Sequence, residues 1–356
     1  MRIHFIDNIR ILAILMLFPY HTCMIYNGYE SFYIHGPVVS GCDLFIFLTS
    51  IWFMPLLFFI SGSGSFFAMK KRSVRQYSRE RVARLLIPLI SGIVLLVPFQ
   101  SFFANKFHNQ YSGDYFSFLK VFFTTLTDMT GYDGGFTTGQ LWFILYLFLI
   151  SLLAIPLMLY IRKRGEDFFP AFFHPVKILL FCLIPFLLTP VLEIGGKSFG
   201  AFFGFFILGF LFSKRREFYK VINKWRLFYL VLTLSGTGLY YVLYRRFGWP
   251  SGYSPQSIAF GLLRIFLTWS SILTIIGYGC KLNRSTRLTA YFNRGIFPIY
   301  IFHQTWLVIA AYYLFKITDN FAVQFVFTII ISFILSLLSY EVVKRFKVTR
   351  ILFGIK

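Results

Sequence analysis

Long apolar runs, each bounded by charged residues or by Gly, Pro or Asn, follow one another along the whole chain. A hydrocarbon layer about 30 Å thick needs about 20 apolar residues in helical form. Ten candidate runs lie at residues 5–27, 41–69, 85–104, 140–161, 176–193, 198–213, 227–244, 257–280, 295–315 and 320–343. The fifth and sixth are the weakest, because only the turn from Glu193 to Lys197 separates them. The pattern predicts an all-α integral membrane protein with about ten transmembrane helices.

Composition supports this interpretation and excludes other classes of protein. Only 13% of the 356 residues are charged and 57% are hydrophobic, whereas soluble domains carry about a quarter charged residues. The net charge of +22 would suit a nucleic-acid ligand, but so apolar a chain has little water-facing surface for one. We therefore expect a lipid bilayer as its surroundings and no nucleic-acid partner. With no internal repeat or linker, we expect one membrane domain over residues 1–356 and no separate soluble domain.

The distribution of basic residues predicts the orientation. If the N-terminus is cytoplasmic, about 27 Lys and Arg fall in inside segments and about 6 in outside segments. Cytoplasmic loops carry the excess of basic residues in membrane proteins, so both termini are expected to be cytoplasmic. The longest outside segment, residues 105–140, holds three aspartates and several aromatic residues.

Four ionisable residues, Arg10, His21, Arg264 and His303, lie inside predicted spans, where each is costly and is a functional candidate. Arg10 and His21 are eleven residues apart, which places them about 20° from full registration on one helix face. Asp7 is close enough along the helix to hold the guanidinium. An Arg near the cytoplasmic end and a His deeper in the membrane, both on one helix face, are typical of side chains that line a cavity entered from the cytoplasm. Snorkelling of Arg10 and a packing role for His21 are the structural alternatives.

Further candidates lie at the span ends. The run from Ser61 and Gly62 to Ser65 allows close approach of a ligand or of another helix. Arg81 and Arg84 could hold phosphates through their planar donor groups, or could bind anionic lipid. Trp142 begins the fourth run, where an interfacial tryptophan is also expected. No His or Cys spacing indicates a metal site.

The order of these motifs resembles the acyltransferase 3 family of multipass bacterial enzymes that modify glycans. The resemblance rests on motifs in the same order along most of the chain. These are Arg10 and His21 with ten residues between them, Phe58 to Gly62, Arg81 to Leu85 followed by Pro88, Leu141 to Phe143, and Tyr300 to Gln304. Within the family, Pro19-Tyr20-His21 and His303-Gln304-Thr305 resemble the glucan succinyltransferase branch.

The resemblance implies transfer of an acetyl or succinyl group from cytoplasmic acyl-CoA to a hydroxyl of a glycan outside the bacterial inner membrane. Catalytic roles then fall to His21, Arg10 and His303, with His21 as the general base. The acyl-CoA site takes Arg81, Arg84, Ser61 and Gly62, and the acceptor site takes Trp142, Gln304 and Arg264. Donors for an oxyanion are sought among His303, Gln304 and Trp142.

A multipass transporter or flippase, with Arg10, His21 and Arg264 as substrate or proton-relay residues, is the alternative. A membrane scaffold without catalysis is a further one. The acyl group, the acceptor and the oligomeric state stay open from the sequence.

Overall fold

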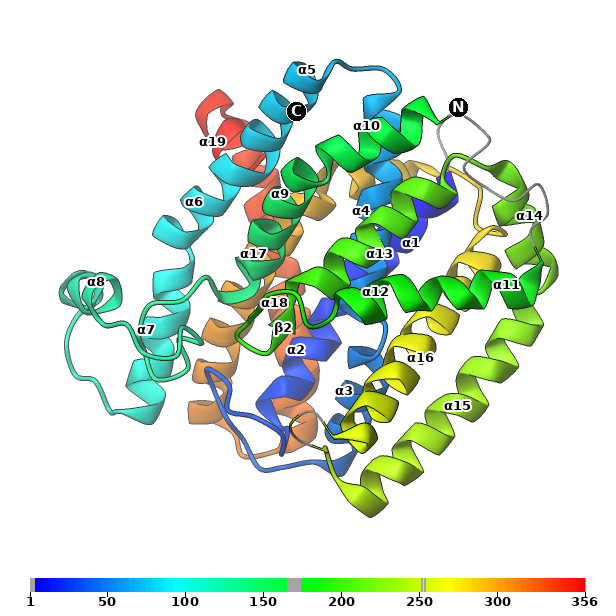
Figure 1. Ribbon diagram of the computed structural model, residues 1–356. Helices are drawn as coiled ribbons and strands as arrows, with labels where there is room; N and C mark the ends of the chain where they lie inside the picture. The colour runs from blue at the N-terminus through cyan, green and yellow to red at the C-terminus, as the bar shows by residue number, and fades with distance from the viewer. Residues whose placement is uncertain (1–3, 165–173, 251, 253, 356) are drawn as a thin grey trace. The chain divides into compact units, whose positions relative to one another are not determined.

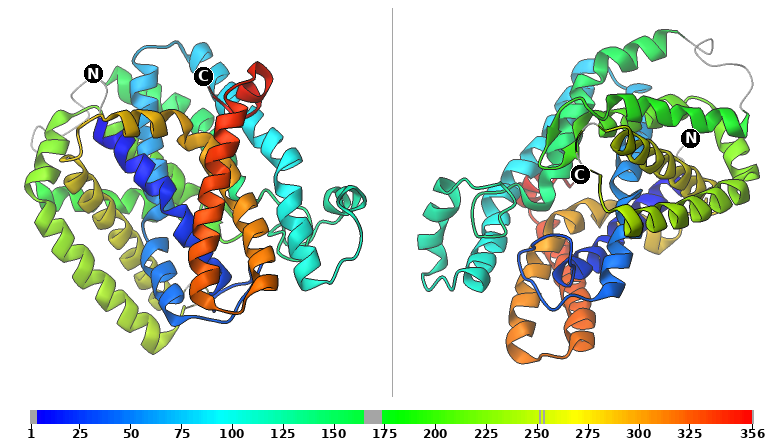
Figure 2. Two further views of the ribbon diagram at one scale, coloured as in Figure 1. Left: turned by 180° about the vertical axis from the view of Figure 1, so that it is seen from behind. Right: turned by 60° about the horizontal axis from the view of Figure 1, so that its bottom comes forward.

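The computed structural model describes residues 4–164, 174–250, 252 and 254–355 (Figures 1 and 2). Arg2 and Lys356, which count toward the predicted orientation, lie outside these residues. The first half contains α1 (His4–Leu15), α2 (Leu17–Ile25), α3 (Ser40–Ser50), α4 (Phe53–Met69), α5 (Val74–Arg81), η1 (Val82–Leu86), α6 (Ile87–Leu95), α7 (Val97–His108), α8 (Tyr115–Thr124), η2 (Gly139–Leu141), α9 (Trp142–Leu153) and α10 (Ile155–Lys163).

The second half contains one two-stranded antiparallel hairpin and helices on either side of it. Its elements are α11 (Pro175–Leu179), η4 (Leu180–Cys182), α12 (Leu183–Leu188), β1 (Glu193–Ile194), β2 (Lys197–Ser198), α13 (Phe199–Phe212), α14 (Arg216–Lys224), α15 (Arg226–Phe247), α16 (Pro255–Gly279), α17 (Arg287–Ile317), α18 (Phe321–Val343) and α19 (Lys347–Leu352).

The all-α membrane architecture is confirmed. In the described part of the chain, seven helices are long and apolar enough to cross a membrane, and α9 with α10, bent by 48°, makes an eighth if counted as one span. The predicted fifth and sixth runs correspond to Pro175–Leu188 and Phe199–Phe212, which are shorter apolar helices. At 1.5 Å per residue, the 14 residues of α13 reach only about 21 Å. The predicted count of ten full spans is therefore not confirmed.

Prolines explain where the apolar runs break into separate helices. A proline has no N–H to donate to the carbonyl four residues before it, and its ring crowds that carbonyl. Helix ends or irregular turns lie within about six residues before the prolines at 19, 55, 88, 98, 156 and 185. Thus α1 ends at Leu15, four residues before Pro19, and η1 is a π-helical turn whose last bond joins Ile87 N–H to Val82 O. Pro298, by contrast, lies inside an unbroken α17.

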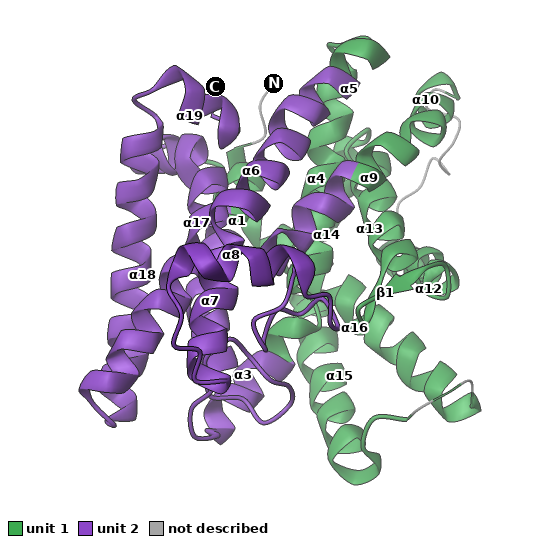
Figure 3. Ribbon diagram, turned by 90° about the vertical axis from the view of Figure 1, so that its left-hand side faces the viewer, with its two compact units in different colours: residues 1–10, 48–77, 149–285 green, residues 11–47, 78–148, 286–356 purple. Residues whose placement is uncertain are grey.

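The chain divides into two compact units (Figure 3). Unit 1 comprises residues 1–10, 48–77 and 149–285, and unit 2 comprises residues 11–47, 78–148 and 286–356. In unit 1, α4 packs along α13 and α15 packs along α16. In unit 2, α17 is the central helix and packs against α2, α7 and α18. The α17–α18 pair is visible from behind in Figure 2. Whether the two units form one functional domain stays a prediction.

Glycines allow α4 and α13 to touch backbone to backbone in unit 1. A Cβ atom on Gly62 would lie 1.9 Å from the carbonyl oxygen of Phe206, and one on Gly209 would lie 1.9 Å from that of Phe59. Ser63 strengthens the contact by donating from Oγ to the carbonyl oxygen of Gly209 at 3.1 Å. Close helix packing, one of the two interpretations of this small-residue run, is therefore observed at Gly62.

We expect Gly62→Ala and Gly209→Ala each to destabilise the protein by about 1–3 kcal/mol, because overpacking forces the two helices apart. Thermal unfolding of the purified protein in detergent or nanodiscs measures the effect. Gly64→Ala is the matched control, because a Cβ there meets nothing within 4 Å. A Gly62→Ala protein as stable as the Gly64→Ala protein would contradict the close contact.

Candidate active site

Two histidine rings face each other in unit 2. His21 lies on α2 and His303 lies on α17, and their ring centroids are 5.2 Å apart with an interplanar angle of 40°. His303 is fully buried, and the ring of Phe18 meets it edge-on at 5.7 Å. The ring of Phe32 stacks on His21 at 5.9 Å. The structure thus brings together two of the three predicted catalytic residues.

The backbone fixes the tautomer of neutral His303. Its Nδ1 lies 2.5 Å from the carbonyl oxygen of Tyr300. Because a carbonyl oxygen can only accept, Nδ1 carries the hydrogen and Nε2 keeps its lone pair. His303 Nε2 and His21 Nδ1 are both buried and have no hydrogen-bond partner among the described residues. Buried polar atoms without partners are rare and costly in native proteins, so this pair has the character of a reaction site.

Three glutamine side chains form a chain of hydrogen bonds beside the histidines, which we call the glutamine relay: Gln140, Gln100 and Gln304. Gln140 donates from Nε2 to the carbonyl oxygen of Ile301 at 2.8 Å. Gln100 donates from Nε2 to Gln140 Oε1 at 2.9 Å, and Gln304 donates from Nε2 to Gln100 Oε1 at 3.1 Å. All three residues are buried. The relay joins α7 and η2 to the central helix α17.

Two further hydrogen bonds hold the relay in place. Gln100 Nε2 also donates to Thr305 Oγ1 at 2.8 Å, and that hydroxyl donates to the carbonyl oxygen of Leu96 at 3.3 Å. The hydroxyl of Tyr300 donates to the backbone carbonyl of Gln140. The far end of the relay, Gln304 Oε1, is buried and has no hydrogen-bond partner in the described part of the protein.

Aromatic residues of two loops continue from His21 toward one end of unit 2. Phe32, which stacks on His21, is held by a hydrogen bond from His108 Nε2 to its carbonyl oxygen at 2.9 Å. The ring of Tyr132 lies 5.8 Å from Phe32 and 5.2 Å from Tyr33. Burial, followed by the nearby Glu30 carboxylate, raises the pKa of the Tyr132 phenol above its usual value. The phenol therefore stays protonated at neutral pH.

Asp128 lies in the same loop region and keeps its charge. The backbone N–H of Thr130 donates to Asp128 Oδ1 at 3.0 Å, and this bond is the main reason that the pKa of the carboxyl lies below its ordinary value. Tyr33 fixes the loop from the other side by donating its hydroxyl to the carbonyl oxygen of Thr130 at 3.0 Å.

The predicted pairing of Arg10 with Asp7 is confirmed, with Arg10 Nη2 3.0 Å from Asp7 Oδ1. The shared face of Arg10 and His21 assumed one uninterrupted helix, and the break at Met16 lies between them. Arg10 belongs to unit 1 and His21 to unit 2. The catalytic role of Arg10 stays a prediction.

Arg81 ends α5, and Arg84 lies within the π-helical turn η1. Both side chains are half-buried, whereas Arg79 on α5 is exposed. The wider turn changes the angle between the two arginines from that of an α-helix. Single π-helical turns occur frequently at functional sites, and this one was not predicted from the sequence.

The remaining candidates occupy separate places. Trp142 begins α9 in unit 2, where its ring meets Tyr146 edge-on at 5.4 Å. Arg264 is exposed on α16 of unit 1, and Ser61 is half-buried on α4 of the same unit. Their roles stay predictions. Among the residues that the structure describes, no cluster of three or more His, Cys, Asp or Glu side chains is placed to hold a metal ion.

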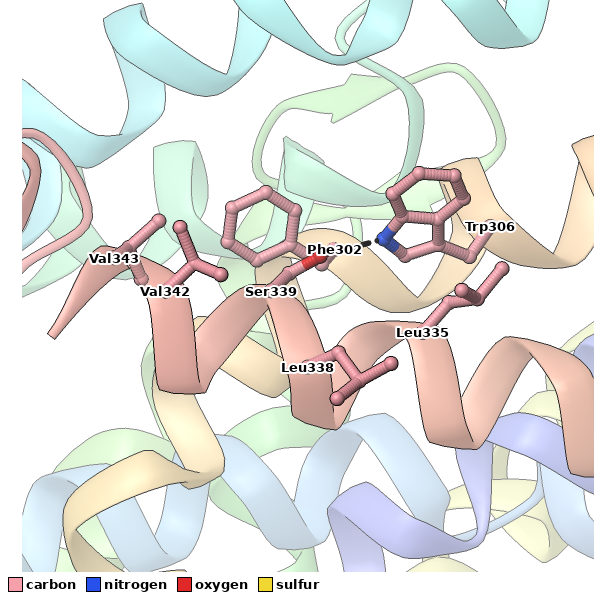
Figure 4. A pocket seen from close by; sticks show the side chains of 7 residues that line it. All are labelled: Phe302, Trp306, Leu335, Leu338, Ser339, Val342 and Val343. Carbon is pink, nitrogen blue, oxygen red and sulfur yellow. Dashed lines mark hydrogen bonds between the residues drawn. The ribbon is translucent and has the colours of Figure 1, made fainter.

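A groove of about 260 Å³ lies between α17 and α18 on another face of unit 2 (Figure 4). Phe302, Leu335, Leu338, Val342 and Val343 line it together with Trp306 and Ser339, and Trp306 Nε1 donates to Ser339 Oγ at 2.8 Å. It contains no titratable side chain, so it supplies no acid or base. Leu338 and Val342 are exposed, which suits contact with lipid chains.

Comparisons with known proteins show the family of the chain. A family model described as an acyltransferase domain, of the acyltransferase 3 type, matches residues 3–341. The chain belongs to this family. Glucans biosynthesis protein C of Salmonella schwarzengrund is 23% identical over 383 residues, covering 99% of this chain and 94% of the relative. The protein of the same name from Escherichia coli O1:K1 is 23% identical over 385 residues with the same coverage. No solved structure matches.

Both the family and the resemblance to this branch are thus confirmed, and the chain is an acyltransferase and a multipass membrane protein. Two members of the glutamine relay in this acyltransferase, Gln100 and Gln140, were not predicted as site residues. The sequence contains a signal for Gln100, which is an uncharged amide inside an apolar run, where a polar side chain needs an internal partner. Ionisable side chains alone do not reveal such an amide.

The tautomer of His303 is open to direct measurement. Nitrogen NMR of the acyltransferase with labelled histidine should find, for neutral His303, a protonated Nδ1 and an unprotonated Nε2, because Nδ1 donates to Tyr300 O. His303→Gln assigns the signal by removing it. A neutral ring protonated on Nε2 would contradict the hydrogen bond that orients this residue.

Proposed function

We propose that this acyltransferase moves a small acyl group, acetyl or succinyl, from cytoplasmic acyl-CoA to a hydroxyl of a glycan outside the bacterial inner membrane. The observation that carries the proposal is the pair of facing histidines, His21 and His303, each with a buried ring nitrogen that has no partner among the described residues, in a chain of this family. The name of the similar glucans biosynthesis protein C supports a glycan acceptor. Family membership favours an enzyme over a transporter.

His21 acts as the general base in this proposal. It removes the proton of the acceptor hydroxyl while the hydroxyl oxygen attacks the thioester carbonyl. The C–S bond then breaks, the sulfur of CoA takes the proton from His21, and the products are an ester and free CoA. A route through an acyl group carried on His21 uses the same residue and gives the same products.

His303 assists His21. Because its Nδ1 hydrogen is bonded to Tyr300 O, the Nε2 of neutral His303 has a free lone pair, and its ring faces that of His21. When His21 takes the proton of the acceptor hydroxyl, it becomes a positively charged imidazolium. A hydrogen-bond acceptor beside it stabilises that charge. The ion pair of Arg10 with Asp7 holds the guanidinium on α1. The catalytic role proposed for Arg10 rests on the motif that it shares with His21 in the sequence.

The donor site is assigned to Arg81 and Arg84, with Ser61 on the approach. Planar guanidinium groups bind phosphate oxygens in pairs, and the phosphates of CoA offer such oxygens. The backbone of α13 occupies the space next to Gly62, so Gly62 contributes to the helix packing that holds Ser61 in place rather than to a direct contact with CoA.

The acceptor site is assigned to the opposite end of unit 2. There the loop at residues 26–39 and the loop after α8, at residues 125–138, bring Phe32 and Tyr132 toward His21. Aromatic rings and a few polar groups are common in small-molecule sites, and the charged Asp128 lies in the same region. Gln304 and Trp142 are the further proposed acceptor contacts in unit 2. Arg264, on α16 of unit 1, is proposed as an acceptor contact from the sequence alone.

The charge of unit 2 supports the orientation. At one end are the basic residues Arg79, Arg81, Arg84, Arg287, Arg294, Lys344, Arg345, Lys347 and Arg350, and near the other are Lys106, Lys120 and Lys316. The basic end is the cytoplasmic one by the positive-inside rule. Acyl-CoA would therefore meet Arg81 and Arg84 from the cytoplasm, and the glycan would meet the aromatic loops from outside.

Replacement of His21 tests the chemistry. We expect His21→Ala to lower kcat by about 10²- to 10⁴-fold, the contribution of a general base, roughly 3–5 kcal/mol. Release of CoA and formation of acylated glycan are measured together and should be stoichiometric. His174→Ala, a change at an exposed histidine in unit 1, is the control. Near wild-type turnover by His21→Ala would remove the central assignment.

Replacement of the half-buried arginines tests the donor site. Arg81→Ala and Arg84→Ala should raise KM for acyl-CoA and leave KM for the glycan nearly unchanged, because the lost contacts are to phosphates. Lys at either position should restore only part of the affinity, since it lacks the planar donor pair. Arg79→Ala, an exposed arginine on the same α5, should behave as wild type. If all these variants bind acyl-CoA as tightly as the wild type does, the donor-site assignment is wrong and the two arginines serve only to anchor the protein to anionic lipid.

A further inference from the structure

The direction of the glutamine relay is fixed by backbone carbonyl groups at its start. Gln140 must turn its NH₂ group to the carbonyl oxygen of Ile301, since that oxygen can only accept. Gln140 Oε1 is then left to accept from Gln100, so Gln100 must turn its own oxygen to Gln304. The Thr305 hydroxyl gives the same answer, because it donates to Leu96 O and so accepts from Gln100 Nε2.

The relay therefore leaves an acceptor at its free end. Gln304 donates one Nε2 hydrogen to Gln100, and its Oε1 is buried without a partner in the described part of the chain. The adjacent residue, His303, donates its N–H to Tyr300 O and leaves Nε2 as an acceptor when neutral. A buried acceptor without a partner costs about 1–3 kcal/mol. Among the described residues, Gln304 Oε1 is thus an acceptor that lacks a donor.

We infer that Gln304 Oε1 accepts a hydrogen bond from a hydroxyl group of the acyl acceptor, and that Gln100 and Gln140 are positioning residues that hold this oxygen outward. The inference rests on the proposed function and makes the chemical class of the ligand explicit. The site binds a neutral donor such as a sugar hydroxyl. It discriminates against groups that can only accept, including carboxylates, methyl ethers and fluorine, because two acceptors would then face each other.

The same geometry changes the expected role of Gln304, which was a candidate oxyanion donor. One hydrogen of its Nε2 is bonded to Gln100 Oε1, and the atom left buried without a partner among the described residues is Oε1. An amide oxygen can only accept, so it does not stabilise an oxyanion. Gln304 Oε1 thus contributes to binding the hydroxyl in the ground state, and its loss should appear mainly in the affinity for the glycan.

The test measures binding of short glucan oligosaccharides to the full-length protein in nanodiscs, beside binding of acyl-CoA. Gln304→Leu, Gln100→Leu and Gln140→Leu should each weaken glucan binding by about 2- to 12-fold, the worth of a typical net hydrogen bond, with acyl-CoA affinity unchanged. Gln140 is the decisive position, since its side chain is bonded within the protein and acts only through Gln100. Deoxyfluoro analogues of the oligosaccharide, which keep the size but cannot donate, should bind the wild type as weakly as the parent sugar binds Gln304→Leu.

Two further variants separate positioning from folding. Gln324→Leu is the matched control, because Gln324 is another buried glutamine of unit 2, bonded to Tyr26 and Thr318 and absent from the relay. It should bind glucan as wild type does. Gln100→Glu should lose less affinity than Gln100→Leu, because a protonated carboxyl group still accepts from Gln304 Nε2 and can donate one hydrogen bond toward Gln140 Oε1.

Three results would overturn the inference: relay variants that bind glucan as the Gln324→Leu control does, fluorinated sugars that bind as well as the parent, or a wild type that binds no glucan. Acyl transfer by the wild type is followed separately. Relay-dependent glucan binding without any acyl transfer would refute the proposed function and leave the inference standing. Normal transfer and normal affinity in the relay variants would refute the inference alone.

Discussion

Inside a bilayer, a backbone carbonyl or a side-chain amide has no water to bond, so its partner must come from the chain itself. The features of this protein that shape the site can be traced to that requirement. Each proline removes one backbone donor, and helix ends or irregular turns gather in the residues before six of them. The glutamine amides on α7, η2 and α17 find partners in one another and in backbone carbonyls. Hydrogen bonding thereby determines both where the helices of unit 2 break and how they are joined.

Three of the exceptions to this requirement lie at the candidate site. His21 Nδ1, His303 Nε2 and Gln304 Oε1 are buried without partners among the described residues, and they lie on α2 and α17, which pack against each other. Leaving such atoms unpaired costs stability, and a protein retains that cost where a ligand supplies the missing bonds. The groove between α17 and α18 shows the contrast, since it is open and apolar but has no acid or base.

The sequence predicted much of the architecture and the chemistry, for identifiable reasons. Length and hydropathy identified eight of the apolar segments, counting α9 with α10 as one, since a span needs a fixed number of apolar residues. They failed for the fifth and sixth runs, where Pro175–Leu188 and Phe199–Phe212 have the composition of spans but not the length. His303 could be selected because an ionisable residue at mid-membrane is rarely placed for packing alone. A shared catalytic role with His21 followed from the family resemblance, but their contact could not be derived from spacing, because it joins residues far apart in the chain.

Local backbone geometry was harder to predict from the sequence than the number of apolar helices or the candidate residues. The π-helical turn at Arg84 and the break at Met16 follow from prolines farther along the chain, but a proline does not say which irregularity it causes, as the unbroken α17 around Pro298 shows. The packing role of Gly62 depends on a carbonyl of Phe206, which no local pattern indicates. The glutamine relay required three amides from separate segments, each unremarkable by itself.

The head-to-tail order of the relay has an electrical consequence. The amide dipoles of Gln140, Gln100 and Gln304 add along the chain rather than cancel, because each group donates from its nitrogen and accepts on its oxygen in the same sense. Successive hydrogen bonds polarise one another, by about 10–30% per bond. The last oxygen, Gln304 Oε1, therefore carries more negative charge than the oxygen of an isolated glutamine. Near this oxygen the local electric field favours donor hydrogens and disfavours anions, although no charged side chain belongs to the relay.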